Sequence, residues 1–171
     1  MSEAPRDAAL GGLQPSQLMG ATVEALIEVG KTMLDLHFEP MGEISGFEDG
    51  HLDYGSCISM TRPGGSFNLA LFGKDQTCKT LGRALLGMDP GEDISKEELA
   101  DGLGEILNMV AGVIKRKMTA EEAKGVALGL PLFLSGTDCF KYLAKGIKVF
   151  VQRLAGPELD MEVIMVWKEG T

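Results

Sequence analysis

Hydrophobic positions recur with the spacing of an α-helix in two long segments of the chain. In the first segment, apolar residues fall three or four positions apart, which predicts a helix over 16–36. The second segment opens with Ser95 followed three residues later by Glu98, the pattern of a capping box, and predicts a helix over 96–118. A shorter helix is expected over 75–86.

Alternating hydrophobic and polar positions predict six strands, three in each half of the chain. Glycine and proline clusters at 62–65 and 155–158 are typical of hairpin turns, and 119–124 is expected to be a polar connection. The expected strands cover 40–47, 52–61, 66–73, 125–130, 147–154 and 159–167.

The order of these elements repeats along the chain as helix, three strands, short helix, long helix, three strands. Consecutive hairpins imply a mostly antiparallel sheet with helices packed on a face, so the predicted fold class is α+β with two helix-plus-three-strand half-repeats. Residues 1–15 are small and polar and are expected to form a flexible tail. Residues 16–171 are expected to form a single domain.

The long helix over 96–118 combines an apolar stripe with a polar stripe on its opposite side. At about 100° per residue, Glu105, Asn108 and Gly112 fall within about 40° of the direction of Asp101. Most polar stripes are solvated helix faces. Asparagine is a mediocre helix former, however, and its presence here favours a functional stripe.

Three glycines, Gly102, Gly104 and Gly112, lie in the same helix, where each costs about 1 kcal/mol relative to alanine. Two explanations are open. Small residues beside Glu105 and Asn108 let another surface approach the helix closely, or they allow tight packing against the rest of the chain. The second explanation stays open for Gly102, whereas Gly104 and Gly112 are expected to contact a partner.

The charge balance excludes several classes of function. The 171 residues include 25 acidic and 16 basic side chains, giving a net charge of −9 at pH 7. Such a chain lacks the basic patch that binds nucleic acid or an anionic membrane surface. No apolar run approaches the roughly 18 residues of a membrane helix, and the first residues do not resemble a signal peptide. We therefore expect a cytoplasmic protein.

The cysteines and histidines do not predict a metal site. Cys57, Cys78 and Cys139 are odd in number and widely spaced, and His37 and His51 lie in different segments. No Cys-x-x-Cys pair and no Gly-rich phosphate-binding loop occur. We expect no cofactor or metal that belongs to this chain.

The polar stripe carries a specific spacing: Asp101-x-x-x-Glu105-x-x-Asn108, followed by 22 residues and then Pro131. This pattern resembles the signature of the CheC/CheX/FliY phosphatase family. Four specified residues at fixed spacing arise by chance on the order of once in a thousand sequences of this length. The repeat of a helix plus three strands is similar to the CheC-like fold of that family, so the likeness covers the chain from about residue 16.

The resemblance implies a phosphatase that hydrolyses the aspartyl phosphate on a CheY-like response-regulator receiver domain. It implies that Asn108 positions the attacking water and that Glu105 pairs with the receiver lysine. Asp101 either helps to dock the receiver or favours the N-terminal half of the helix through the macrodipole. Pro131 is expected to shape a connection rather than touch substrate. The receiver would supply its own Mg²⁺.

The first half of the chain does not carry the motif. Three residues after Glu24 and Glu28 stand Ile27 and Lys31 rather than asparagine. A single motif resembles the CheX-like arrangement, and this resemblance implies a homodimer. The alternative is a non-catalytic CheC-like interaction module that binds a receiver or another signalling partner without turnover.

Overall fold

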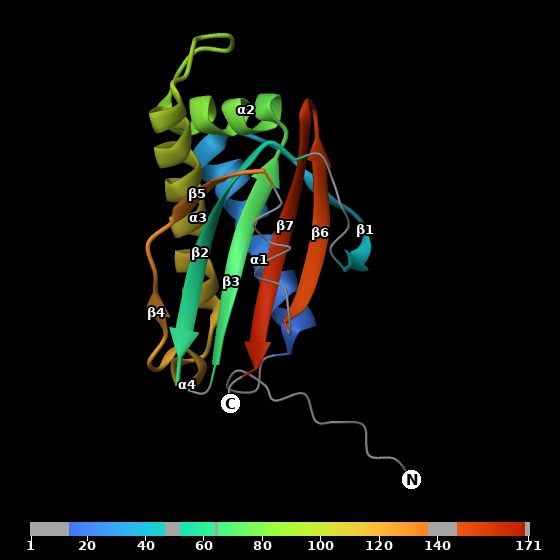
Figure 1. The fold of residues 1–171 in the computed structure, drawn as a ribbon, viewed down its shortest axis with the longest axis vertical. Coiled ribbons are helices and arrows are strands. Elements are labelled where there is room, and N and C mark those ends of the chain that lie inside the picture. Colours follow the sequence, from blue (N-terminus) through green and yellow to red (C-terminus); the bar gives the residue numbers. More distant parts are fainter. Residues whose placement is uncertain (1–13, 47–51, 64, 137–146, 170–171) are drawn as a thin grey trace.

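The computed structural model describes residues 14–46, 52–63, 65–136 and 147–169, which form one antiparallel sheet with helices packed on one face (Figure 1). The predicted α+β class is therefore confirmed. Three features singled out in the sequence lie outside these residues: His51, Cys139 and the expected tail as far as residue 13. The helices are α1 (Pro15–Val29), the π-helical turn η1 (Gly30–Leu34), α2 (Asp75–Leu86), α3 (Lys96–Lys117) and α4 (Ala120–Ala123).

The sheet contains seven strands in the described part of the chain, one more than the sequence predicted. The strands are β1 (Glu39–Ser45), β2 (Tyr54–Arg62), β3 (Gly65–Gly73), β4 (Ala127–Leu128), β5 (Leu132–Ser135), β6 (Lys148–Gly156) and β7 (Leu159–Glu169). Their order is β1-β6-β7-β3-β2-β4, and β5 also pairs with β2.

This strand order supports the predicted pair of half-repeats and shows how the halves interlock. The β2–β3 hairpin of the first half lies beside the β6–β7 hairpin of the second, with Leu69 of β3 opposite Met165 of β7. The first half then contributes one strand to the other half, and the second half contributes two. Strand β1 pairs with β6, whereas β4 and β5 pair with β2. The two halves therefore share a single sheet.

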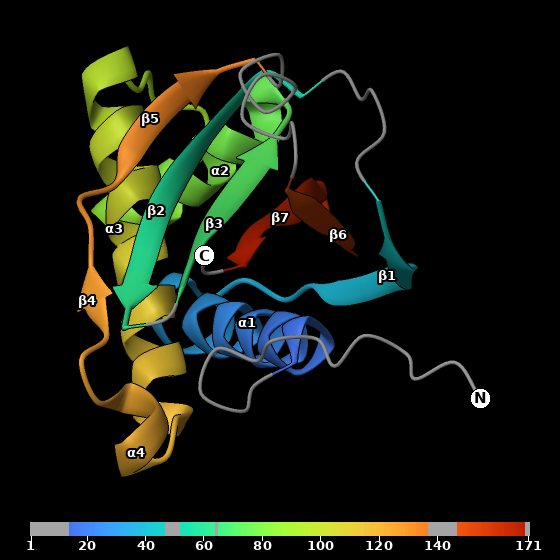
Figure 2. The same cartoon turned by 60° about the horizontal axis from the view of Figure 1, so that its bottom comes forward.

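The main core lies between the sheet and helices α1, α2 and α3, which all cover the same face (Figure 2). The apolar stripe predicted for the long helix faces this core, and Leu103, Ile106 and Val110 are each no more than 1% exposed. Its polar stripe therefore faces away from the sheet. The opposite face of the sheet carries a second, smaller apolar cluster, which includes Phe72 and Ile164.

The predicted first helix ends differently from expectation. The α-helical part stops at Val29 and continues as the π-helical turn η1, after which Asp35 adopts a left-handed conformation with φ 52°. The ring of Phe38 occupies the space beside Gly30, where a Cβ would lie only 2.6 Å from ring carbons. Within this π turn Gly30 and Leu34 are buried, whereas Met33 is 57% exposed.

The predictions for 119–130 were wrong in detail. The polar connection contains a helical turn, α4, which is capped by Thr119 and Glu122. The single strand expected over 125–130 is only two residues long, and the second strand, β5, begins after Pro131. Proline has no N–H to give to a strand ladder, which explains why this edge of the sheet is interrupted there.

The N-terminus of α3 is fixed by the capping box that the sequence predicted. The Ser95 hydroxyl accepts a hydrogen bond from the Glu98 N–H, and the Glu98 carboxylate accepts one from the Ser95 N–H at 2.8 Å. The hydrogen bond that the Ser95 N–H donates to the carboxylate lowers the pKa of Glu98, and the Ser95 side chain lowers it further. The stabilisation is therefore present above the ordinary glutamate pKa and is lost as the pH falls through the lowered value.

We expect Ser95→Ala to lower the free energy of unfolding by about 1 kcal/mol, because the mutation removes the acceptor for an otherwise unpaired helix N–H. Urea denaturation at neutral pH would measure the change. Lys96→Ala is the matched control, since Lys96 is the exposed neighbouring residue and has no capping role. An equal loss in both variants would contradict this interpretation of the cap.

Candidate functional site

The polar stripe of α3 lies on the surface of the molecule. Asp101 and Glu105 are exposed and Asn108 is partly exposed, one helical turn after Glu105. The Asn108 amide Nδ2 donates a long hydrogen bond of 3.4 Å to the Glu105 Oε2. The two side chains therefore face the same side of the helix and lie within reach of each other.

These residues line a surface hollow of about 600 Å³, which we call the motif hollow. Helix α3 forms its floor, the last turn of α2 forms one wall, and Pro131 closes the side next to the sheet edge. Among the described residues that line the hollow, the two charged side chains, those of Asp101 and Glu105, are acidic. The lining residues are Leu85, Leu86, Ala100, Asp101, Gly102, Gly104, Glu105, Asn108 and Pro131.

Two of the helix glycines hold the walls of the motif hollow against α3. A Cβ at Gly102 would lie 3.3 Å from the Cα of Gly82 in α2, so these two helices cross at van der Waals distance. A Cβ at Gly104 would lie 3.2 Å from the Cβ of Pro131. Packing within the chain therefore accounts for Gly102 and Gly104. The partner contact expected of Gly104 stays a prediction.

Gly112 differs from the other two glycines. It is partly exposed, and a Cβ added there would meet nothing within 4 Å among the residues the structure describes. The fold of this chain thus gives no packing reason for the cost of about 1 kcal/mol that glycine imposes in a helix. Gly112 lies one turn beyond Asn108 and leaves the helix backbone open to close approach.

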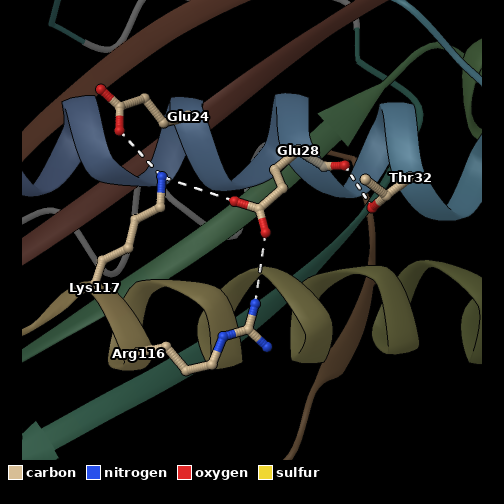
Figure 3. A network of polar contacts seen from close by, with 5 residues as sticks. All are labelled: Glu24, Glu28, Thr32, Arg116 and Lys117. Carbon is tan, nitrogen blue, oxygen red and sulfur yellow. Dashed lines mark hydrogen bonds and ion pairs between the residues drawn. The ribbon is translucent and has the colours of Figure 1, made fainter.

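The carboxylates of the first helix are used differently from Glu105. Glu24 and Glu28 of α1 face the C-terminal end of α3, where the Lys117 Nζ lies 3.1 Å from a Glu24 oxygen and 3.9 Å from a Glu28 oxygen (Figure 3). Arg116 also pairs with Glu28, at 3.6 Å. These glutamates therefore join the two long helices.

Other candidate groups do not form a comparable site. Burial raises the pKa of the Cys78 thiol to about 12, so this thiol is protonated at neutral pH and is a poor nucleophile. A second hollow of about 530 Å³ lies beside η1 and includes Lys31, His37 and Glu39, but none of the motif residues. In the described ranges, no group of three or more His, Cys, Asp or Glu side chains is placed to hold a metal ion.

Sequence reasoning missed the contribution of α2 to this site. Leu85 and Leu86 line the motif hollow, and Leu86 is 45% exposed. A leucine at the end of an amphipathic helix has no distinctive pattern in the sequence. Its role depends on where α2 crosses α3.

No described helix is long and apolar enough to span a membrane.

Solved structures similar to this chain share its fold. A CheC-like superfamily protein from Shewanella sp. PV-4 matches with a TM-score of 0.70 and 19% identity, covering 91% of this chain and 99% of its own. The chemotaxis protein CheX from Vibrio vulnificus matches with a TM-score of 0.71 and 19% identity, covering 89% and 99%. No curated protein matches the chain in sequence. The chain therefore has the CheC-like fold.

The sequence model of the family described as chemotaxis phosphatase CheX matches residues 54–154, more than half of the chain. The protein therefore belongs to the CheX family. One similar structure is a complex of CheX with CheY, BeF₃ and Mg²⁺ from Borrelia burgdorferi, with a TM-score of 0.65 and 19% identity. That match covers 89% of this chain and 98% of the other.

We expect Gly112→Ala and Gly102→Ala to affect stability in opposite directions. Alanine at 112 meets open space and gains up to about 1 kcal/mol of helix propensity. Alanine at 102 presses against the α2 backbone, where overpacking costs about 1–3 kcal/mol. Chemical denaturation of the two variants would measure the difference. Similar stabilisation in both would contradict the close helix crossing.

Proposed function

We propose that this protein accelerates hydrolysis of the aspartyl phosphate on a CheY-like receiver domain, with Glu105 and Asn108 acting in that reaction. The observation that supports this function best is their shared position on an uncovered face of α3, inside the motif hollow. Membership of the CheX phosphatase family and the CheX–CheY complex among similar structures support the same partner.

The proposed role of Asn108 follows from the chemistry of its amide. Hydrolysis requires a water in line with the P–O bond to the aspartate. The water oxygen forms a bond to phosphorus while that P–O bond breaks, which releases the carboxylate and inorganic phosphate. A neutral amide can accept a hydrogen bond from the water without repelling the anionic phosphoryl group. Asn108 would therefore act by positioning rather than by exchanging a proton.

The proposed role of Glu105 is to pair with the lysine beside the receiver's phosphoryl group. Its carboxylate is exposed and accepts the long hydrogen bond from the Asn108 amide in the free protein. A lysine could replace this weak contact with a charge-assisted one. That exchange would fix the register of α3 on the receiver and leave the Asn108 amide to the water. The Mg²⁺ of the reaction would come with the receiver.

Asp101 and Gly112 extend the proposed contact along α3 in both directions from Glu105 and Asn108. Asp101 would meet the receiver one turn before Glu105, and Gly112 would allow close approach one turn after Asn108. A homodimer and a cytoplasmic location remain predictions. The alternative function, binding without turnover, would require the same exposed stripe and is separated from catalysis by the rate measurement below.

The lifetime of a phosphorylated receiver from the same genome, with and without this protein, tests the proposed function. We expect the protein to shorten that lifetime. Asn108→Ala should reduce the acceleration by about 100-fold or more, because the water loses its positioning group. Circular dichroism and thermal melting should stay near wild type, since Asn108 is partly exposed. Acceleration that persists in Asn108→Ala would contradict the mechanism.

Glu105→Gln tests the lysine pairing separately from the water. We expect weaker binding of the receiver by about tenfold or more, because a charge-assisted pair is replaced by a neutral hydrogen bond. Glu121→Gln is the matched control, because Glu121 is an exposed glutamate in α4, beyond the other end of α3. Titration with a beryllofluoride-activated receiver would measure the affinity. Equal affinities in the two variants would rule out the pairing.

A further inference from the structure

The apolar wall of the motif hollow is formed by Leu85 and Leu86 on the last turn of α2. Leu86 is the last helical residue and is 45% exposed, whereas Leu85 beside it is half-buried. Gly87 then ends the helix in a left-handed conformation with φ 66°. The N–H groups of Gly87 and Met88 both donate to the Arg83 carbonyl, so the final turn is closed by hydrogen bonds.

The position of this wall relative to the motif is fixed by close helix packing. Gly82 lies one turn before Leu86, and its Cα approaches Gly102 of α3. A Cβ at Gly82 itself would lie 2.9 Å from the Ile94 Cδ1 and 3.3 Å from the Leu99 Cδ1. Because the contact between Gly82 and Gly102 holds α2 against α3 one turn before Leu86, Leu86 lies at the edge of the same hollow as Glu105 and Asn108.

The chemistry of the motif hollow restricts what can fill it. Its charged side chains, Asp101 and Glu105, are acidic, and no lysine, arginine or histidine is among the described residues that line it. A complementary surface must therefore carry a cationic group next to an apolar one. A second copy of this chain fits poorly, because each copy has a net charge of −9 and the hollow is itself acidic.

We propose that Leu86 is the apolar docking contact for the receiver domain and sets the affinity of the complex without taking part in hydrolysis. This inference rests on the proposed function, in which a receiver lysine pairs with Glu105. An apolar side chain of the receiver next to that lysine covers Leu86 when the two proteins meet. The contact excludes water from around the Glu105–lysine pair, which strengthens the pair.

A docking residue and a catalytic residue differ in their kinetic effects. An interaction that is equally strong in the bound substrate and in the transition state changes KM and leaves kcat unchanged. Leu86 should behave in this way, because it lies on the wall of the motif hollow, on a different helix from Asn108. Asn108→Ala should lower kcat instead.

The test compares Leu86→Ala with Ile44→Ala in the full chain, using the dephosphorylation of the receiver under multiple-turnover conditions. Ile44 is 39% exposed, close to Leu86 in exposure, but lies on β1 at the opposite end of the sheet. We expect Leu86→Ala to raise KM by up to about tenfold with kcat unchanged, because the complex would bury the 45% of the leucine side chain that is exposed in the free protein. Ile44→Ala should match the wild type.

Several results would overturn the inference. These are an unchanged KM in Leu86→Ala, a lower kcat with an unchanged KM, or an equal rise of KM in Ile44→Ala. Failure of the proposed function is a different result, in which the wild type does not shorten the lifetime of the phosphorylated receiver. In that case, titration with a beryllofluoride-activated receiver tests whether Leu86 is a docking contact. A tenfold weaker affinity of Leu86→Ala supports docking at Leu86, and no binding by the wild type overturns both proposals.

Discussion

The close approach of α3 to its two neighbours is the constraint on which the site depends. Without a Cβ at Gly102, the backbones of α2 and α3 meet, and without one at Gly104, Pro131 reaches the helix. These contacts place an apolar wall and a proline on either side of a polar helix face. The cost of glycine to the helix is thus offset by a geometry that larger residues would prevent.

The two halves of the molecule have a similar layout but use their long helices differently. In α1 the exposed glutamates are engaged by Lys117 and Arg116 of α3, so this surface joins two helices of the same chain. In α3 the corresponding exposed stripe has Glu105 beside an asparagine and faces a hollow. A repeated architecture therefore gives one helix a structural surface and the other a surface that is open to a partner.

The sequence predicts features that local patterns determine. The capping box at Ser95, the bounds of α2 and the faces of α3 follow from residue spacing, and all were found as predicted. Strand β5 after Pro131 and the π turn after Val29 were missed, because each depends on contacts with a distant strand or ring. For the site, the spacing of Glu105 and Asn108 placed both on one face. The sequence could not reveal the α2 wall, since Leu86 joins the hollow only through tertiary packing.

The exchange of strands between the halves has a consequence for folding. Glu39 of β1 pairs with Ala155 of β6, so one edge of the sheet forms only after nearly the whole chain is available. Pairings between such distant positions carry a large loop-closure entropy and slow the search for the native state. Neither half can complete its own sheet, which favours a single cooperative transition. Helix α3 and the first half of the chain should therefore gain and lose their structure together.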